Sequence, residues 1–467
     1  MPASLNLACS FSSKVITASA APRLVYLLVE ITGGEGAGTL PSNLGFIIDT
    51  SDSMRIRLVT DKQFAELVKK GQAQEVMTDG VPAYQITAIS DEQIAHYPRR
   101  IDYVSEALAI AGEFLRPVDC FSLVAFAGWA HCVIPSVAGK ERARLQQAAR
   151  EMEYLRLGDG THMAEGMALS FAELQRQPSR SYAGRMILLT DGHTLNVNEC
   201  YDWAGKARKA GYKLTTMGIG AEFNEDLLIP LADQTGGAAY YIETPEQIPD
   251  AFRKELGAAL RISYRNVEVK LQLPNGVELR RVYRALPEIS TFDHGPNLGG
   301  KEQADSSYAL LVGDYDPAAP VALLAELIIP PWPTGTYRLV QAMLTWDDPT
   351  GGGIRANVRQ EVVAEISSVV TARLDEHVMN VVEKVGAFKM GTLALEAAQS
   401  ASKSANPEEK GTATIRLRQA ATRLLDMGEA SLADAMFKQA EVLERSGSMD
   451  PEAAKKLRYE TRRLTQH

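Results

Sequence analysis

Five oxygen-bearing side chains occur at a spacing typical of a cation site. The first three alternate in the sequence D-T-S-D-S, directly after an apolar run, and the other two follow a glycine-rich turn and a second apolar run. Carboxylate and hydroxyl oxygens are the ligands that hard divalent cations prefer in proteins. These side chains are Asp49, Ser51, Ser53, Thr161 and Asp191.

The surrounding sequence predicts how these side chains meet. From position 43 to about 260, short apolar runs alternate with amphipathic helical stretches, which indicates a doubly wound α/β domain with a mainly parallel sheet. Ligands of such sheets bind at the carboxyl ends of the strands, where the candidate residues lie. The predicted strands are Leu44–Ile48, Phe121–Phe126, Met186–Leu189, Lys213–Ile219 and Ala238–Ile242, with His131–Ile134 as an antiparallel edge strand.

The three segments resemble, in order, the metal-ion-dependent adhesion site of von Willebrand factor type A domains. The resemblance covers about residues 43–255 and predicts a six-stranded sheet of that family. It implies that Ser51 and Ser53 bind the ion directly and that Thr161 binds it directly or through water. It also implies that Asp49 and Asp191 mainly hold coordinated waters.

The all-oxygen ligand set favours Mg²⁺, with Mn²⁺ or Ca²⁺ as other candidates. Neutral hydroxyl ligands leave much of the ion's charge uncompensated, so an open coordination position favours an incoming carboxylate. The predicted function is therefore a metal-dependent protein-interaction scaffold that binds an Asp or Glu of a partner. The layout resembles bacterial intracellular multidomain members of the family, some of which work beside AAA+ ATPases.

Two other functions are weighed against this one. A metal-dependent phosphohydrolase could use Asp49 as nucleophile, but the phosphatase pattern needs a second aspartate where this chain has Ser51. We therefore expect no enzyme activity. An extracellular adhesin would need an export signal, which the first forty residues lack. Three residues beside the site, Asp159, His162 and His193, are interpreted as ordinary turn and loop residues.

The rest of the chain predicts three further parts around the α/β domain. Residues 261–368 read as antiparallel strands of a β-sandwich, and residues 1–42 are expected to complete it across the inserted domain at 43–260. Residues 369–467 read as three or four helices. Their basic cluster is interpreted as a solvated face, and it contains Lys455, Lys456, Arg458, Arg462 and Arg463.

An insertion at about 58–98 separates the metal loop from the first helix of the α/β domain. It predicts a helix over 61–70 and a hairpin that turns at Thr78-Asp79-Gly80. In one hypothesis the insertion is a lid on the metal face. The lid either shapes the partner surface or supplies its own carboxylate ligand, from Asp61, Glu66 or Asp79. In the other hypothesis it is an excursion packed on the sandwich.

Composition restricts the class of protein. The formal net charge of −9 argues against a nucleic-acid partner. No window approaches the roughly 18 uncharged apolar residues of a membrane span. The four cysteines lack CxxC spacing and two lie in apolar runs, which favours a reducing compartment and a cytoplasmic location.

Overall fold

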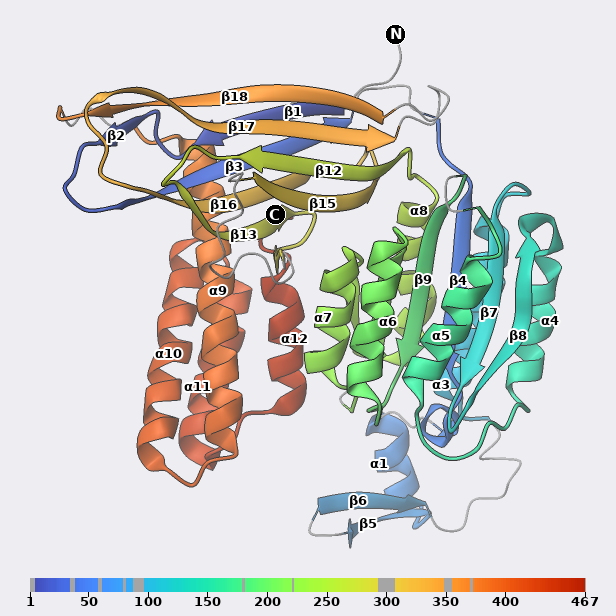
Figure 1. Ribbon diagram of the computed structural model, residues 1–467. Coiled ribbons are helices and arrows are strands. Elements are labelled where there is room, and N and C mark those ends of the chain that lie inside the picture. Colours follow the sequence, from blue (N-terminus) through green and yellow to red (C-terminus); the bar gives the residue numbers. More distant parts are fainter. Residues whose placement is uncertain are drawn as a thin grey trace.

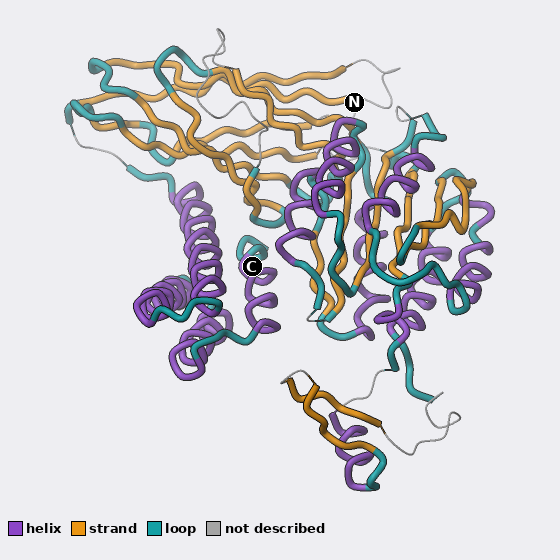
Figure 2. The backbone as a smooth tube through the Cα atoms, turned by 60° about the horizontal axis from the view of Figure 1, so that its bottom comes forward, coloured by secondary structure: helices purple, strands orange, loops and turns teal. Residues whose placement is uncertain are grey.

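The chain forms an α/β domain, a β-sandwich and a helical bundle (Figure 1). The bundle descends from the sandwich beside the α/β domain, as the turned view in Figure 2 also shows. This arrangement confirms the fold class predicted from the sequence. The computed structural model describes residues 5–33, 38–57, 61–78, 81–86, 96–178, 181–220, 222–292, 307–347, 355–369 and 373–466.

A six-stranded sheet forms the centre of the α/β domain, in the order β11-β10-β9-β4-β7-β8. Neighbouring strands pair in parallel, except that β8 runs antiparallel to β7 at the edge. The predicted strands and the edge strand are confirmed. Their bounds are β4 (Ser42–Asp49), β7 (Cys120–Phe126), β8 (Ala130–Ala138), β9 (Ala183–Thr190), β10 (Lys213–Ile219) and β11 (Ala239–Ile242).

Helices cover both faces of this sheet (Figure 1). Every residue of β4, β7 and β9 is buried, as expected for parallel strands covered on two sides. The helices on one face are α3 (Arg100–Phe114), α4 (Ala143–Met152) and α8 (Ile248–Ala259). Those on the other face are α5 (Met163–Leu174), α6 (Val197–Lys209) and α7 (Glu225–Thr235).

Two sheets of five strands each form the sandwich. Their facing apolar side chains make one core that includes Leu27, Val269 and Leu344. The first sheet contains β1 (Leu5–Phe11), β3 (Arg23–Gly33), β16 (Val321–Ile329), β13 (Glu278–Leu286) and β14 (Ser290–Thr291). The second contains β15 (Ser307–Tyr315), β12 (Tyr264–Gln272), β17 (Gly335–Asp347), β18 (Arg355–Ser367) and β2 (Val15–Thr17).

The N-terminal strands belong to this sandwich, although the whole α/β domain separates them from its other strands in the sequence. Strand β3 pairs antiparallel with β16, so that Ile31 faces Val321, and β2 joins β18. The chain enters and leaves the α/β domain at neighbouring points, where the amide of Leu40 donates to the carbonyl of Ile262 at 2.8 Å. The predicted insertion of the α/β domain into the sandwich is therefore confirmed.

Strand β13 was not predicted. Its sequence E-L-R-R-V-Y-R-A-L carries three arginines, which hide the apolar alternation. Arg280 and Arg281 lie on the surface, but Arg284 is buried. The strand forms because Leu279, Val282 and neighbouring apolar residues complete the cores below and above the sheet.

The insertion forms α1 (Asp61–Lys69) and a hairpin of β5 (Ala73–Thr78) with β6 (Val81–Ile86). It projects from the end of the α/β domain opposite the sandwich (Figures 1 and 2). The hypothesis that it packs on the sandwich is therefore wrong. Its base is fastened by a bridge between Arg57 and Arg99. The predicted turn residue Asp79 lies outside the described residues.

Residues 373–466 contain four helices, where three or four were predicted. They are α9 (Glu376–Ser402), α10 (Pro407–Asp426), α11 (Ala430–Ser446) and α12 (Pro451–Thr461). Their apolar faces pack together and against the outer face of the sheet that contains β3, β13 and β16. Asn406 and Asp450 cap the starts of α10 and α12 with their side chains. Among the described residues, no helix has the length and apolar character needed to cross a membrane.

The basic cluster on and after α12 is not a solvated face, and that interpretation was wrong. Lys455 and Arg462 are only 6 % and 4 % exposed. The Lys455 ammonium lies 3.2 Å from Glu225, and the Arg462 guanidinium binds both carboxylate oxygens of Asp233 at 2.5 and 2.8 Å. Both carboxylates belong to α7, so these charges join the helical bundle to the α/β domain.

The Arg462 contact yields a test of this interface. We expect Arg462→Gln to lower the free energy of unfolding by about 3 kcal/mol, because it leaves a largely buried carboxylate without its bidentate partner. Urea unfolding of the full chain measures this change.

A matched control is Arg445→Gln, because Arg445 is 82 % exposed near the end of α11. We expect that variant to stay within about 0.5 kcal/mol of the wild type. Equal effects of the two substitutions would contradict the structural role of Arg462.

Candidate metal centre

The predicted site begins where the central strand β4 ends. Asp49 is its last residue and is completely buried. One carboxylate oxygen accepts a hydrogen bond from the amide of Ser51 at 2.9 Å. The other accepts from the hydroxyl of Thr190, the last residue of β9, at 2.6 Å. These two bonds hold the carboxylate in a fixed orientation at the carboxyl edge of the sheet.

The two serines connect this loop to the end of the neighbouring strand. The hydroxyl oxygens of Ser51 and Ser53 lie 3.1 Å apart. The Ser53 hydroxyl donates to one oxygen of Asp191 at 2.7 Å. Sequence positions 138 residues apart thus meet in one hydrogen-bonded cluster, because β4 and β9 are adjacent and parallel.

Thr161 lies on the loop beside Asp191. Its carbonyl accepts from the hydroxyl of Thr194 at 2.7 Å, which joins the two loops. A β-carbon placed on Gly192 would lie 3.7 Å from the Thr161 hydroxyl, so this side chain faces the turn after Asp191. The structure therefore brings all five predicted ligand residues to the same edge of the sheet.

The flanking residues take no part in these contacts. Asp159 and His193 are exposed. His162 precedes α5, and its ring nitrogen lies 3.8 Å from Glu165.

Sequence reasoning missed Arg100, which stands beside the cluster. Its guanidinium donates to Asp191 at 3.1 Å and to the backbone carbonyl of Ser53 at 3.0 Å. Arg100 opens α3, after the insertion and far from the metal loop in the sequence. Arg100 reaches the site because the two ends of the insertion lie close together. No local sequence pattern indicates this proximity.

Electrostatics at the site favour a bound cation. Burial and the nearby charge of Asp191 together raise the pKa of Asp49 to about 6. Burial also raises the pKa of Asp191. Two carboxylates that repel each other in a buried site gain stability when a cation lies between them.

Comparisons with known proteins assign two parts of the chain. The von Willebrand factor type A domain profile matches residues 88–254. The profile of the Sll0103-like, C-terminal alpha-helical domain matches residues 376–467. The chain contains a von Willebrand factor type A domain. The matched range begins after the loop with Asp49, Ser51 and Ser53, so the profile match does not include these three candidate ligands.

Two curated relatives each match about half of this chain. The uncharacterized protein sll0103 of Synechocystis is 27% identical over 244 residues, which cover 50% of this chain and 54% of that one. The uncharacterized protein YfbK of Escherichia coli is 24% identical over 237 residues, which cover 50% of this chain and 33% of that one. The matches thus span between a third and about half of these relatives.

A solved structure extends the likeness to the whole fold. The von Willebrand factor type A protein from Catenulispora acidiphila has a TM-score of 0.76 and 18% sequence identity, and the match covers 99% of this chain and 97% of that one. At this identity the likeness shows the fold alone. It confirms that the type A domain, the sandwich and the helical bundle occur together in one known architecture.

The donor set of the type A domain fits a hard divalent cation. Adjacent ligands of an octahedral Mg²⁺ lie about 3 Å apart, given metal–oxygen distances of about 2.1 Å. The 3.1 Å between the Ser51 and Ser53 hydroxyl oxygens matches that separation. Among the described residues, no group of three or more His, Cys, Asp and Glu side chains gathers at metal-binding distance. Hydroxyls must therefore supply part of any coordination shell at this site.

The position of Arg100 gives a test of the charge balance in the type A domain. We expect Arg100→Gln to lower the dissociation constant for Mn²⁺ several-fold, because a cation beside the site repels the ion by on the order of 1 kcal/mol. Isothermal titration calorimetry at fixed ionic strength measures this constant.

The control for Arg100→Gln is Arg359→Gln, an exposed position on β18 of the sandwich, which we expect to bind Mn²⁺ like the wild type. Weaker binding by Arg100→Gln would show instead that the orientation of Asp191 matters more than the repulsion.

Proposed function

We propose that this protein is a metal-dependent protein-binding scaffold. A divalent cation, Mg²⁺ in the first place and Mn²⁺ or Ca²⁺ as alternatives, is held by Asp49, Ser51, Ser53, Thr161 and Asp191. When bound, the cation supplies an open coordination position for an Asp or Glu carboxylate of a partner protein. Type A domains commonly mediate protein–protein interactions, often through a metal ion.

The hydrogen-bonded cluster of two aspartates and two serines carries this proposal. Its hydrogen bonds hold the carboxylate and hydroxyl oxygens close together, so little reorganisation would be needed for these groups to bind a metal. Only two of the five ligand residues are carboxylates, so at most two negative charges face a divalent ion. The neighbouring Arg100 adds a positive charge, so the site with its bound ion favours the carboxylate of a partner.

Exposed apolar side chains surround this edge of the sheet. Ile56, Trp129 and Leu195 are 59 %, 49 % and 80 % exposed, and they follow β4, β7 and β9 respectively. Large apolar residues gathered on loops around a polar centre are typical of protein-binding surfaces. The insertion begins after Arg57, at the same edge of the sheet. It would therefore form one border of the partner-binding surface.

The proposal extends to the setting of the protein. The family resemblance suggests an AAA+ ATPase system as the class of partner. Cys9, Cys120 and Cys200 are buried thiols within the packed interior, which fits a reducing, cytoplasmic compartment.

A phosphohydrolase that uses Asp49 as nucleophile fits the geometry less well. Asp49 has no exposed surface, and both its oxygens already accept hydrogen bonds. A nucleophile must reach the substrate, so we propose that the chain has no enzyme activity of this kind. Turnover of a generic phosphate ester with Mg²⁺ that is abolished by Asp49→Asn would overturn that statement.

The metal mechanism is tested by the double variant Ser51→Ala, Ser53→Ala. We expect it to lose binding of Mn²⁺ by calorimetry and Mg²⁺-dependent capture of partner proteins from cell lysate, because two direct ligands are gone. Wild-type capture is expected to disappear in EDTA.

The control for the double variant is Ser181→Ala, an exposed serine just before β9 at the other end of the sheet. It should behave like the wild type. Capture that persists in both EDTA and the double variant would rule out the metal mechanism.

The apolar rim predicts a different kind of defect. We expect Trp129→Ala to weaken capture of the partner by roughly tenfold or more, as for an aromatic side chain in a binding surface. Mn²⁺ affinity should stay unchanged, because Trp129 makes no contact with the five ligand residues among the interactions described above.

The matched control for Trp129→Ala is Leu374→Ala, an exposed apolar residue beside the sandwich. If the two variants captured the partner equally well, the rim would have no role in binding.

A further inference from the structure

A second polar cavity lies at the end of the α/β domain opposite the metal centre. A chamber of about 260 Å³ and a smaller one of about 20 Å³ share Lys213, Asp233, Gly236 and Arg284 among their lining residues. Lys213 begins β10 and Asp233 lies on α7 of the type A domain, whereas Arg284 lies on β13 of the sandwich. Arg462, after α12, also lines the larger chamber. All three parts of the chain thus contribute to the walls.

Each carboxylate that lines these chambers already has a basic partner. Asp233 binds Arg462, and Glu255 binds Arg185. The remaining pairs are Glu288 with Arg463, Asp314 with Arg265 and Asp316 with Arg261. The negative charge of the cavity is therefore neutralised by these five arginines.

Besides the exposed Lys254, whose ammonium lies over the ring of Tyr240, three further cations line the cavity without a carboxylate of their own. Arg284 is only 9 % exposed, and within the described part of the chain its guanidinium has no hydrogen-bond or ion-pair partner. Its one stacking contact is with the ring of Phe292, at 5.5 Å. Arg208 likewise has no such partner among the described residues. The ammonium of Lys213 donates only to the backbone carbonyl of Asp314, at 2.6 Å.

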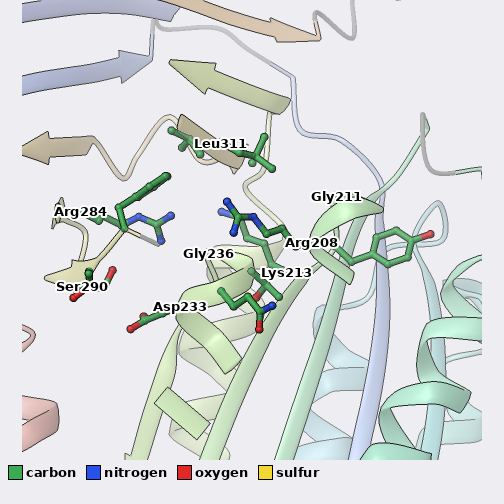
Figure 3. A pocket seen from close by; sticks show the side chains of 15 residues that line it. Arg208, Gly211, Lys213, Asp233, Gly236, Arg284, Ser290 and Leu311 are labelled. Carbon is green, nitrogen blue, oxygen red and sulfur yellow. The ribbon is translucent and has the colours of Figure 1, made fainter. Parts of the chain in front are cut away.

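The geometry directs these cations toward one space. Figure 3 shows the side chains of Arg284 and Arg208 extending into the smaller chamber from opposite sides, with Lys213 beside them. The hydroxyl-bearing residue Ser290 lines the same wall. Two guanidinium groups and an ammonium thus converge on one space, and among the described residues neither guanidinium has a hydrogen-bond or ion-pair partner there.

Burying an unpaired cation is costly unless something compensates for its charge. The unfavourable environment of Arg284 and Lys213 lowers the pKa of both side chains. Burial lowers the pKa of Arg284, and burial together with the nearby Arg185 lowers the pKa of Lys213 to about 7. A bound anion would reverse both effects.

We propose that this cavity binds a small molecule through its phosphate group, which Arg284, Arg208 and Lys213 hold. Guanidinium groups match phosphate oxygens in pairs, and the ammonium adds a point charge. The surplus of cations suits a doubly charged phosphate better than a single carboxylate. The larger chamber, lined also by Tyr240 and the apolar Val312 and Val321, has room for the remainder of such a molecule.

Binding there would also affect how the parts of the chain are held together. The phosphate would contact Arg208 and Lys213 on the type A domain and Arg284 on the sandwich at once. A ligand that binds only when these parts are docked stabilises the docked arrangement. The site is separate from the metal centre, so it does not depend on the proposed function.

The test uses inorganic phosphate and pyrophosphate as probes on the full chain. Thermal unfolding and calorimetry are recorded in EDTA, with chloride added to keep the ionic strength constant. We expect both probes to raise the unfolding temperature of the wild type in a saturable way. Arg284→Gln and Arg208→Gln should each weaken the apparent affinity by roughly tenfold or more, since each removes charge-assisted hydrogen bonds.

Two comparisons keep the test decisive. Arg281→Gln removes the same charge from an exposed position on the same strand and should respond to phosphate like the wild type. Without phosphate, Arg284→Gln should unfold at a temperature equal to or above that of the wild type, because a buried unpaired charge is gone. Arg208 is only half-buried, so its variant reports on binding even if Arg284→Gln fails to fold.

The proposal is overturned if neither probe raises the unfolding temperature beyond the chloride control. It is equally overturned if Arg284→Gln and Arg208→Gln respond to the probes as Arg281→Gln does. The Ser51→Ala, Ser53→Ala variant should bind phosphate normally, so a failure here is distinguishable from a failure of the metal mechanism.

Discussion

The ion pairs between the last helix and α7 are the interaction on which the arrangement of the three parts depends. Arg462 with Asp233 and Lys455 with Glu225 bring charged groups out of water, and such groups remain charged only when they are well paired. Because the pairs are specific in position, they fix the orientation of the helical bundle against the type A domain. The same seam forms one wall of the polar cavity below the sandwich.

The arrangement of the candidate metal ligands was largely predictable from the sequence because it follows from local rules. Residues directly after buried parallel strands must meet at one edge of the sheet, so Asp49 and Asp191 could be placed together from their positions alone. Arg100 could not be found in this way. It reaches the site only because the two ends of the insertion come together, and no periodicity or motif in the sequence indicates that they do.

The fold was predictable wherever a buried strand or helix shows a recognisable pattern of apolar residues in the sequence. The continuous apolar strands of the α/β domain and the alternating strands of the sandwich follow that rule. Strand β13 and the face of α12 do not, because charged side chains among their residues, Arg284 on β13 and Lys455 on α12, are buried. A buried charge looks the same in the sequence as a charge in water, whether it is paired with a distant carboxylate, as Arg462 is, or unpaired, as Arg284 is. Arg462 was therefore interpreted as a surface residue, and Arg284 was not singled out.

The pairing of β3 with β16 has a consequence for the order in which the protein forms during synthesis. Strands β1 to β3 leave the ribosome before the α/β domain, but Ile31 finds its partner Val321 only after the whole α/β domain has been made. The α/β domain holds all its own strands and can fold meanwhile. Until then, the apolar Leu27 to Val29 segment of the nascent chain lacks its neighbouring strand β16, so it is made before the α/β domain but paired after it, and it depends on protection from aggregation in the interval.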